Sequence, residues 1–197
     1  MKKLVFLRHG EIEGSASRYI GVTNAHLSEK GREQITGLAS RLDGENFDRV
    51  ICSPFDRCRE TVQLLNRPEH IVFDERIREI DFGLWESKTF TYIKEQFPEA
   101  VSQWSNGTPE FRFPKGEKID EFQKRIADFA QSLYSLKEER LLIVTHGGVI
   151  RHLICTLLNI PMANYLYFRV NYGRLVLLEL YSEGGVLTGL NRRCIDG

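Results

Sequence analysis

The stretch that decides the fold is LVFLRHGE, residues 4–11, in which four apolar residues are followed at once by polar ones and Gly10. A short apolar run bounded in this way is typical of a strand that is buried on both faces of a sheet. Two further segments repeat the pattern, RVICSP at residues 49–54 and LLIVTHGG at residues 141–148. We therefore expect three buried strands, each followed by polar residues at its carboxyl end.

Helical periodicity separates these strands. Ser28 can cap a helix whose apolar positions 35, 38, 39 and 42 recur at helical spacing and which ends near Gly44. The other predicted elements are helices over residues 57–65, 119–136 and from 147 onward, a strand over 71–73, and two last strands over 174–181 and 186–190 joined by a turn at 182–185. This alternation predicts an α/β fold, a three-layer sandwich in which a mostly parallel, mixed sheet carries helices on both faces.

One segment has an unusual composition. Eight of the 21 aromatic side chains lie between residues 82 and 113, and Pro98, Pro109 and Pro114 interrupt any long helix there. The sequence thus predicts one domain over residues 1–197, with an aromatic-rich lid of a short helix and loops inserted at about 82–116. The rings either form a small core of the lid itself or line a pocket for a flat ligand.

Composition excludes several classes of partner. The 27 basic and 27 acidic residues give zero net charge, so neither a nucleic acid nor an anionic membrane is an expected partner. No apolar run approaches the length of a membrane span, and the run at residues 4–7 is too short for a secretory signal. The four cysteines show no CxxC spacing, which favours a reduced, cytoplasmic protein. The oligomeric state stays open.

Basic and imidazole side chains follow the predicted strands. Arg8 and His9 come after the first, Arg57 follows the second, and His146 and Gly147 follow the strand at 141–144. In open α/β sheets ligands bind at the carboxyl ends of the strands, where these residues would meet. Clustered positive charge is stable only with an anion, and guanidinium groups and a free helix N-terminus match a phosphate group. The expected ligand is a small phosphate ester.

Two other chemistries fit the sequence less well. A cation would be repelled by the arginines, and no HExxH or CxxC motif is present, so we expect no metal and no other cofactor. A C-x5-R phosphatase loop is also absent, because Cys58 lies six residues after Cys52 and Leu64 six residues after Cys58. The expected nucleophile is therefore His9. The remaining histidines are expected to be structural or surface groups: His26, His70 and His152.

The segment LRHGE, residues 7–11, resembles the signature of the histidine phosphatase superfamily, the phosphoglycerate-mutase-like group. The resemblance continues through LSEKGR at 27–32, SP at 53–54 with Arg57, REIDFGLWE at 78–86, KGE at 115–117 and THGG at 145–148. It implies a metal-independent phosphomonoesterase in which His9 takes the phosphoryl group and Glu79 is the proton donor. It further implies that the phosphate is held by Arg8, Arg57, His146 and the Gly147 backbone, with Gly21 as a substrate contact.

The implied roles agree with simple chemistry. Imidazole attacks phosphorus only when neutral, and adjacent guanidinium groups favour the neutral form of His9. Without the resemblance, Glu79 would be interpreted as a surface carboxylate paired with Arg76 or Arg78. Ile12 stands where the superfamily usually has Thr or Ser, and Ser87 stands where it usually has Gly.

Three classes of function remain possible on the sequence: a phosphomonoesterase, a phosphoglycerate mutase and an inactive phosphate-binding protein. Within the superfamily the chain is most similar to the alpha-ribazole phosphatases of cobalamin biosynthesis, on its length, its loop at residues 19–24 and its aromatic lid. The alternatives are a broad-specificity sugar or nucleotide phosphatase and a phosphoglycerate mutase. A catalytically inactive phosphate-binding protein is a third, less favoured class, because Arg8, His9, Arg57, Glu79 and His146 are all present.

Overall fold

A six-stranded sheet in the order β3-β2-β4-β1-β5-β6 forms the centre of the computed structural model, which describes residues 1–66, 71–105 and 108–195. The strands are β1 (Lys2–Arg8), β2 (Arg49–Cys52), β3 (Ile71–Phe73), β4 (Arg140–Thr145), β5 (Leu175–Tyr181) and β6 (Gly184–Arg192). The first four in chain order pair in parallel, whereas β5 and β6 pair antiparallel to their neighbours. The predicted mixed, mostly parallel sheet is confirmed.

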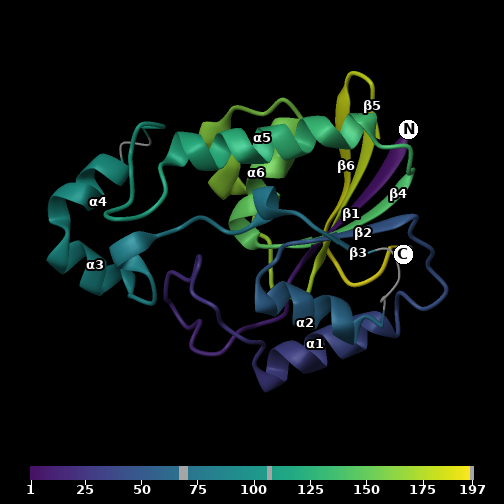
Figure 1. Ribbon diagram of the computed structural model, residues 1–197, viewed down its shortest axis with the longest axis horizontal. Coiled ribbons are helices and arrows are strands. Elements are labelled where there is room, and N and C mark those ends of the chain that lie inside the picture. The colour runs from purple at the N-terminus through teal and green to yellow at the C-terminus, as the bar shows by residue number, and fades with distance from the viewer. Residues whose placement is uncertain (67–70, 106–107, 196–197) are drawn as a thin grey trace.

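Helices cover both faces of this sheet, as Figure 1 shows, with α1 and α2 on one side and α5 and α6 on the other. The helices are α1 (Glu29–Ala39), α2 (Asp56–Leu64), α3 (Phe90–Gln96), α4 (Pro98–Ser105), α5 (Ile119–Ser135) and α6 (Gly147–Leu157). Short 3₁₀ helices are η1 (Glu75–Ile77), η2 (Gly83–Trp85) and η3 (Met162–Tyr167). The three-layer sandwich is therefore confirmed.

Local details differ from the expectation at three places. Helix α1 begins as predicted, with the Ser28 hydroxyl accepting the Gly31 N–H, but ends at Ala39. Pro98 interrupts the helical stretch as predicted, since α3 ends at Gln96, but it also opens α4, where its missing N–H costs nothing, so the lid contains two short helices instead of one. Strand β6 begins at Gly184, which shortens the predicted turn to residues 182–183.

Register brings the strand ends to one edge of the sheet. Arg8 pairs with Thr145 and Cys52 pairs with Val144, so β1, β4 and β2 end at the same level. The polar residues that follow these strands consequently emerge side by side, at the end of the sheet opposite the N-terminus (Figure 1). Helices α3 and α4 lie beyond this edge.

Most lid rings pack against one another. Trp85 is fully buried, with its ring centroid 5.2 Å from that of Phe113 and 5.7 Å from that of Trp104. These rings continue the core that α5 and α6 form with the sheet. Phe90 and Tyr92 are exposed. The buried rings thus build a core of the lid. Among the described residues no helix is long and apolar enough to cross a membrane.

Candidate active site

The predicted polar residues meet where β1, β2 and β4 end. His9, Arg57, Glu79 and His146 are all buried, with His146 completely so. The ring centroids of His9 and His146 lie 5.1 Å apart. Burial of so many polar groups is costly unless each has a partner. Each of these four groups has a hydrogen-bond partner in the structure.

His9 is held in one tautomer. Its Nδ1 lies 2.8 Å from the Gly10 carbonyl oxygen, so in the neutral ring Nδ1 carries the proton and the Nε2 lone pair is available. Burial lowers the pKa of His9 well below its usual value, and the charges of Arg57 and Arg8 lower it further. A Cβ on Gly10 would lie 2.6 Å from the Gly31 carbonyl oxygen, so only glycine fits this approach to α1.

The guanidinium group of Arg8 is held by a backbone carbonyl and an aromatic ring. One guanidinium nitrogen donates to the Val170 carbonyl at 2.6 Å, and Cζ lies 3.6 Å from the centroid of the Tyr172 ring. The Nε atom of Arg8 is buried and has no hydrogen-bond partner among the described residues. Burial lowers the pKa of Arg8. A Cβ on Gly147 would lie 3.1 Å from Arg8 Cζ, so the start of α6 packs directly on the guanidinium group.

Arg57 connects the loop at residues 21–23 to His146. Its Nε donates to His146 Nδ1 at 3.1 Å, while Nη1 and Nη2 donate to the carbonyls of Thr23 and Gly21 at 2.9 and 2.5 Å. A guanidinium group has five N–H donors, so these three bonds leave donors for an anion. Burial lowers the pKa of Arg57 as well.

His146 is neutral for the same reasons as His9. Burial lowers its pKa well below the usual value, and the charge of Arg57 adds to this effect. Since Nδ1 accepts from Arg57, the proton lies on Nε2, which donates to the Ser53 hydroxyl at 2.7 Å. The site therefore combines two cations, the buried Arg57 and the partly buried Arg8, with two neutral imidazoles, an arrangement that favours a bound anion.

Glu79 lies against the first turn of α6. Its Oε2 accepts the Gly148 N–H at 3.0 Å, and a Cβ on Gly148 would lie 2.4 Å from Glu79 Oε1. Arg76 and Arg78 pair with Asp74 and Glu75 instead. The interpretation of Glu79 as their surface partner is therefore wrong.

The backbone that carries Glu79 is held by α5. Arg125 donates to the carbonyls of Arg76 and Arg78 at 2.7 Å, and forms an ion pair with Glu117 at 2.7 Å.

Gly21 contributes to the site through its backbone. Its carbonyl accepts from Arg57, and its N–H lies 3.1 Å from both carboxylate oxygens of Glu86. A Cβ at this position would lie 1.9 Å from the Ile80 carbonyl oxygen, so the close approach requires glycine. A direct contact of Gly21 with substrate stays a prediction.

Several site residues carried no assigned role at the level of sequence. Tyr172 stacks on Arg8 and lies 5.5 Å from the His9 ring, and the adjacent Gly173 N–H bonds to both the Arg8 and His9 carbonyls at 3.1 Å. Ser53 was visible only as part of a motif, yet it fixes the tautomer of His146. Tyr172 follows no motif, so no signal in the sequence pointed to it.

The other histidines and Ile12 lie outside this cluster. His152 is buried between Phe122 and Tyr165, and its Nδ1 lies 2.8 Å from the Gly148 carbonyl. Burial lowers the pKa of His152 to about 4. His26 pairs with Glu60 near the surface, and His70 lies outside the described residues. Ile12 is buried in the core beside α1 and pairs with Leu27.

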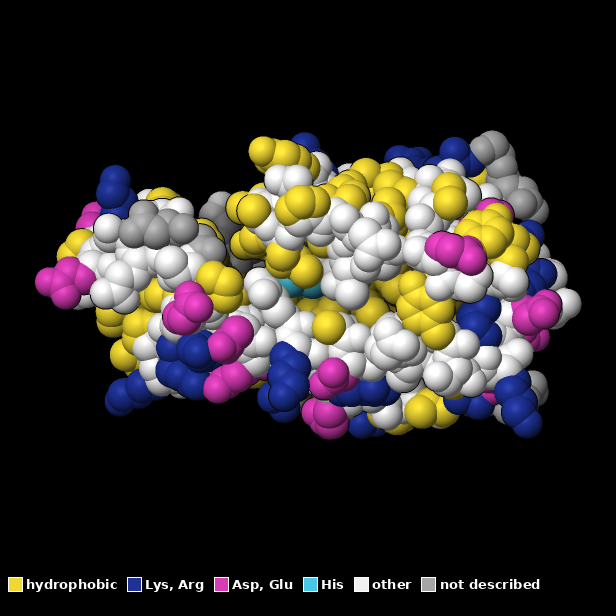
Figure 2. All heavy atoms as spheres, turned by 90° about the horizontal axis from the view of Figure 1, so that it is seen from above, with side chains coloured by type: hydrophobic (Ala, Val, Ile, Leu, Met, Phe, Trp, Pro, Cys, Tyr) yellow, Lys and Arg dark blue, Asp and Glu magenta, His cyan; other side chains and the backbone are white. Residues whose placement is uncertain are grey.

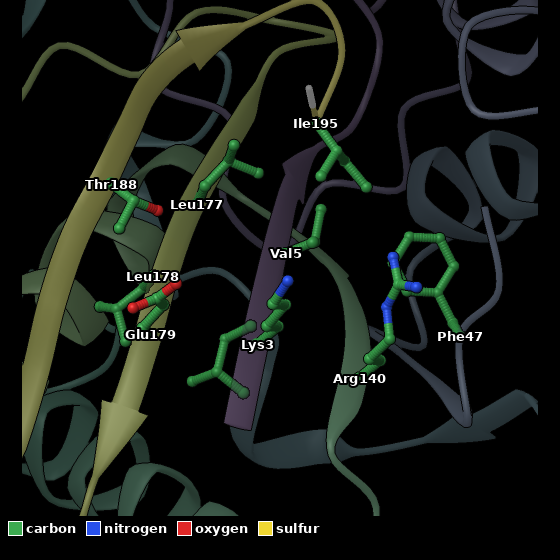
Figure 3. A pocket seen from close by; sticks show the side chains of 10 residues that line it. Lys3, Val5, Phe47, Arg140, Leu177, Leu178, Glu179, Thr188 and Ile195 are labelled. Carbon is green, nitrogen blue, oxygen red and sulfur yellow. The ribbon is translucent and has the colours of Figure 1, made fainter. Parts of the chain in front are cut away.

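The surface shows two hollows of different character. In Figure 2 histidine atoms are visible only in a recess between hydrophobic side chains. A second hollow, shown in Figure 3, is lined by Lys3 and Val5 of β1, Leu177 and Glu179 of β5, and Thr188 of β6. It contains none of the predicted site residues. Within residues 1–66, 71–105 and 108–195, no three His, Cys, Asp or Glu side chains are grouped to hold a metal.

Comparisons with known proteins give one consistent result. The family model of the histidine phosphatase superfamily (branch 1) matches residues 4–193. The adenosylcobalamin/alpha-ribazole phosphatase of Salmonella typhimurium is 32% identical over 199 residues, 98% of each chain. The crystal structure of the alpha-ribazole phosphatase from Shigella flexneri has a TM-score of 0.90 and 28% identity, covering 99% of this chain and 98% of that one. A mutant phosphoserine phosphatase from Entamoeba histolytica, in complex with phosphoserine, has a TM-score of 0.85 and 26% identity over 98% of both chains.

Proposed function

This chain belongs to the histidine phosphatase superfamily (branch 1) and is a phosphatase, and we propose that it acts through a covalent phosphohistidine on His9. The observation that carries the proposal is the buried, neutral His9 between Arg8 and Arg57, with its Nε2 lone pair available. A phosphoryl group bound by both cations would be held beside a nucleophile in the correct protonation state.

In the first half of the proposed reaction, His9 Nε2 forms a bond to phosphorus and the ester P–O bond breaks. Glu79 transfers its proton to the leaving oxygen. The negative charge on the phosphoryl oxygens is stabilised by Arg8, Arg57 and the Gly147 N–H. A bound dianion favours the protonated form of His146. The added proton lies on Nδ1, which no longer accepts from Arg57 Nε, so both groups are then able to donate to the phosphate.

In the second half, a water molecule attacks phosphorus and the bond from phosphorus to His9 Nε2 breaks. Glu79 accepts the proton of this water, so inorganic phosphate leaves and both residues return to their starting states. The cationic and N–H donors do the work of charge stabilisation, and no step requires a metal ion.

The proposed substrate is alpha-ribazole 5'-phosphate, which places the enzyme in cobalamin biosynthesis. Similarity over 98% of the chain to an enzyme described as an adenosylcobalamin/alpha-ribazole phosphatase supports this choice. Zero net charge supports a small-molecule substrate over a nucleic acid. The four cysteines are free, which supports a cytoplasmic location.

The substrate is tested by phosphate release in the presence of a chelator. Alpha-ribazole 5'-phosphate, phosphoserine, 3-phosphoglycerate and a panel of sugar phosphates and nucleotides are compared at matched concentrations. We expect kcat/KM for the ribazole ester to exceed the others by orders of magnitude. Similar values for all esters would identify a broad-specificity phosphatase, and interconversion of phosphoglycerates without net release would identify a mutase.

The acid role of Glu79 is tested separately with Glu79→Gln. Since kcat/KM reports the first transfer, it should fall by about 100-fold for alkyl phosphates, whose leaving group needs a proton. For p-nitrophenyl phosphate, whose leaving group is stable as an anion, the loss should be much smaller. Equal losses on both esters would remove Glu79 from the role of general acid.

A further inference from the structure

The carboxylate of Glu86 is the meeting point of an unusual set of hydrogen bonds. It accepts the backbone N–H groups of Gly21, Val22 and Thr23 at 3.0–3.2 Å, and that of Phe82 at 3.1 Å. The Thr23 hydroxyl donates to the same carboxylate at 2.5 Å. Hydrogen bonds to an ionised acceptor are about twice as strong as those between neutral groups. Glu86 therefore fixes three successive residues of one loop.

The opposite side of this loop holds Arg57. The carbonyl oxygens of Gly21 and Thr23 accept from the two terminal nitrogens of the guanidinium group. The N–H groups of the loop thus face Glu86 while its carbonyls face Arg57. Gly21 also packs against the Ile80 carbonyl, since a Cβ there would lie only 1.9 Å from the oxygen. The loop has little room to shift, so its position sets that of Arg57.

Charge reinforces this geometry. The negative charge of Glu86 is one of the influences that raise the pKa of Arg57, opposing the effect of burial. Arg57 in turn donates through Nε to His146. The position of the loop that Glu86 holds therefore also affects the orientation of His146. The hydrogen bonds of Glu86 in the described structure go to residues 21–23 and 82, so any effect of Glu86 on Arg57 through hydrogen bonds passes through the loop.

We infer that Glu86 is a positioning residue for phosphoryl transfer, which acts through the loop at residues 21–23 to aim Arg57 at the phosphate. The inference rests on the proposed role of Arg57 in binding the phosphate. Glu86 directly follows η2 at the start of the lid. The inference therefore means that the conformation of the lid affects catalysis. The lid and the phosphate site are therefore coupled through one carboxylate.

The test is a double-mutant cycle between Glu86→Gln and Arg57→Lys. Glutamine keeps the size of the side chain but turns an N–H₂ donor toward backbone N–H groups that need an acceptor. In the wild-type background we expect kcat/KM for p-nitrophenyl phosphate to fall by about 10- to 100-fold, since small misplacements of a catalytic group have effects of this size. The inhibition constant of inorganic phosphate should rise in parallel. In the Arg57→Lys background the same substitution should cost less than about 3-fold, because coupled residues are not additive.

Asp48→Asn is the matched control. Asp48 also accepts two backbone N–H bonds, from Glu139 and Arg140 at 2.8 Å, but at the opposite end of the sheet. This variant should lose thermal stability without a change in phosphate affinity.

Equal losses from Glu86→Gln in both backgrounds would overturn the inference while leaving the role of Arg57 intact. Full activity in Arg57→Lys alone would overturn the phosphate-binding role and the inference with it.

Discussion

The proposed phosphate site and the lid are built on opposite physical principles. The site, formed by Arg8, His9, Arg57, Glu79 and His146, buries charged and polar groups that are held by hydrogen bonds from the ends of strands and the start of α6. The lid, residues 82–105 and 108–116, buries aromatic rings at centroid distances of 5.1–6.0 Å, mostly edge to face. Geometry in the site is fixed by donors and acceptors, whereas cohesion in the lid comes from apolar area.

This difference separates function from stability. Buried guanidinium groups cost free energy in the folded state and are useful only when an anion is bound. Buried rings contribute stability whether or not a ligand is present. Substitutions in the site are thus expected to remove activity with little loss of stability, and substitutions in the lid core the reverse.

The largest effect is expected from His9→Ala, which removes the proposed nucleophile. Turnover of any phosphate ester should fall by about 10⁴-fold or more, which corresponds to about 5 kcal/mol of transition-state stabilisation. The unfolding free energy, measured with urea, should change by only about 1 kcal/mol. Rapid quenching of wild type with ³²P-labelled substrate should trap an acid-labile phosphoenzyme that the variant lacks. A variant that still forms this species would place the nucleophile elsewhere.

The second largest effect is expected from Phe111→Ala in the lid. Phe111 is buried, with its ring 5.1 Å from Phe113 and 6.0 Å from Trp85. Loss of this ring should reduce the unfolding free energy by about 3–5 kcal/mol. Below its melting temperature the variant should retain kcat for p-nitrophenyl phosphate to within about tenfold, a loss of no more than about 1.4 kcal/mol. A loss of turnover as large as that of His9→Ala, in folded protein, would break the division between the two regions.

The two regions also differ in how far the sequence predicted them. The site was predictable because its residues directly follow short apolar strands, and parallel strands of similar length end at one edge. Arg8, His9, Arg57 and His146 thus came together as expected. The residues that support this site could not be identified from the sequence, because they contact parts of the chain that are distant in sequence. Glu86 lies more than 60 residues from the loop that it fixes.

The lid shows a different limit of sequence reasoning. Its aromatic composition was evident, yet the two outcomes of a packed core and an open pocket depend on how the rings meet in space. Pro98 had an ambiguous meaning, since proline ends one helix and opens another equally well. The end of α1 was misplaced for a related reason. Leu42 continues the apolar periodicity past Ala39, but it is buried from the turn that follows the helix.

A third, smaller effect concerns pH. The lid segment contains no histidine, whereas burial lowers the pKa values of His9 and His146 in the candidate site and of His152 within α6. For His152 the folded pKa is about 4, below the value of about 6.5 in an unfolded chain. Between these two pH values only the unfolded state binds the proton. The contribution of His152 to the unfolding free energy is therefore constant above about pH 6.5. Between about pH 6.5 and the folded pKa it falls by about 1.4 kcal/mol for each pH unit by which the pH is lowered.

The substitution His152→Gln isolates this contribution. Urea denaturation at a series of pH values from 7 to 4 should show that the unfolding free energy of the variant falls less steeply with decreasing pH than that of wild type. The difference in slope should correspond to the uptake of about one proton fewer on unfolding. Phe111→Leu, which changes only apolar packing, should keep the wild-type slope. An unchanged slope in His152→Gln would mean that His152 titrates equally in the folded and unfolded states.

The smallest effect is expected at Ser87, where the two regions join. Ser87 has φ of 61°, in the left-handed region that costs a residue with a Cβ about 1 kcal/mol or more. Its N–H bonds to the Tyr19 carbonyl and its carbonyl accepts from Arg18, and glycine would keep both bonds. Glycine relieves this strain, but it also has more conformational freedom in the unfolded chain, which lowers the unfolding free energy by about 0.5–1 kcal/mol. Ser87→Gly should thus raise the unfolding free energy by no more than about 1 kcal/mol, with kcat/KM unchanged. A clear loss of stability would show that the serine side chain itself supports this junction.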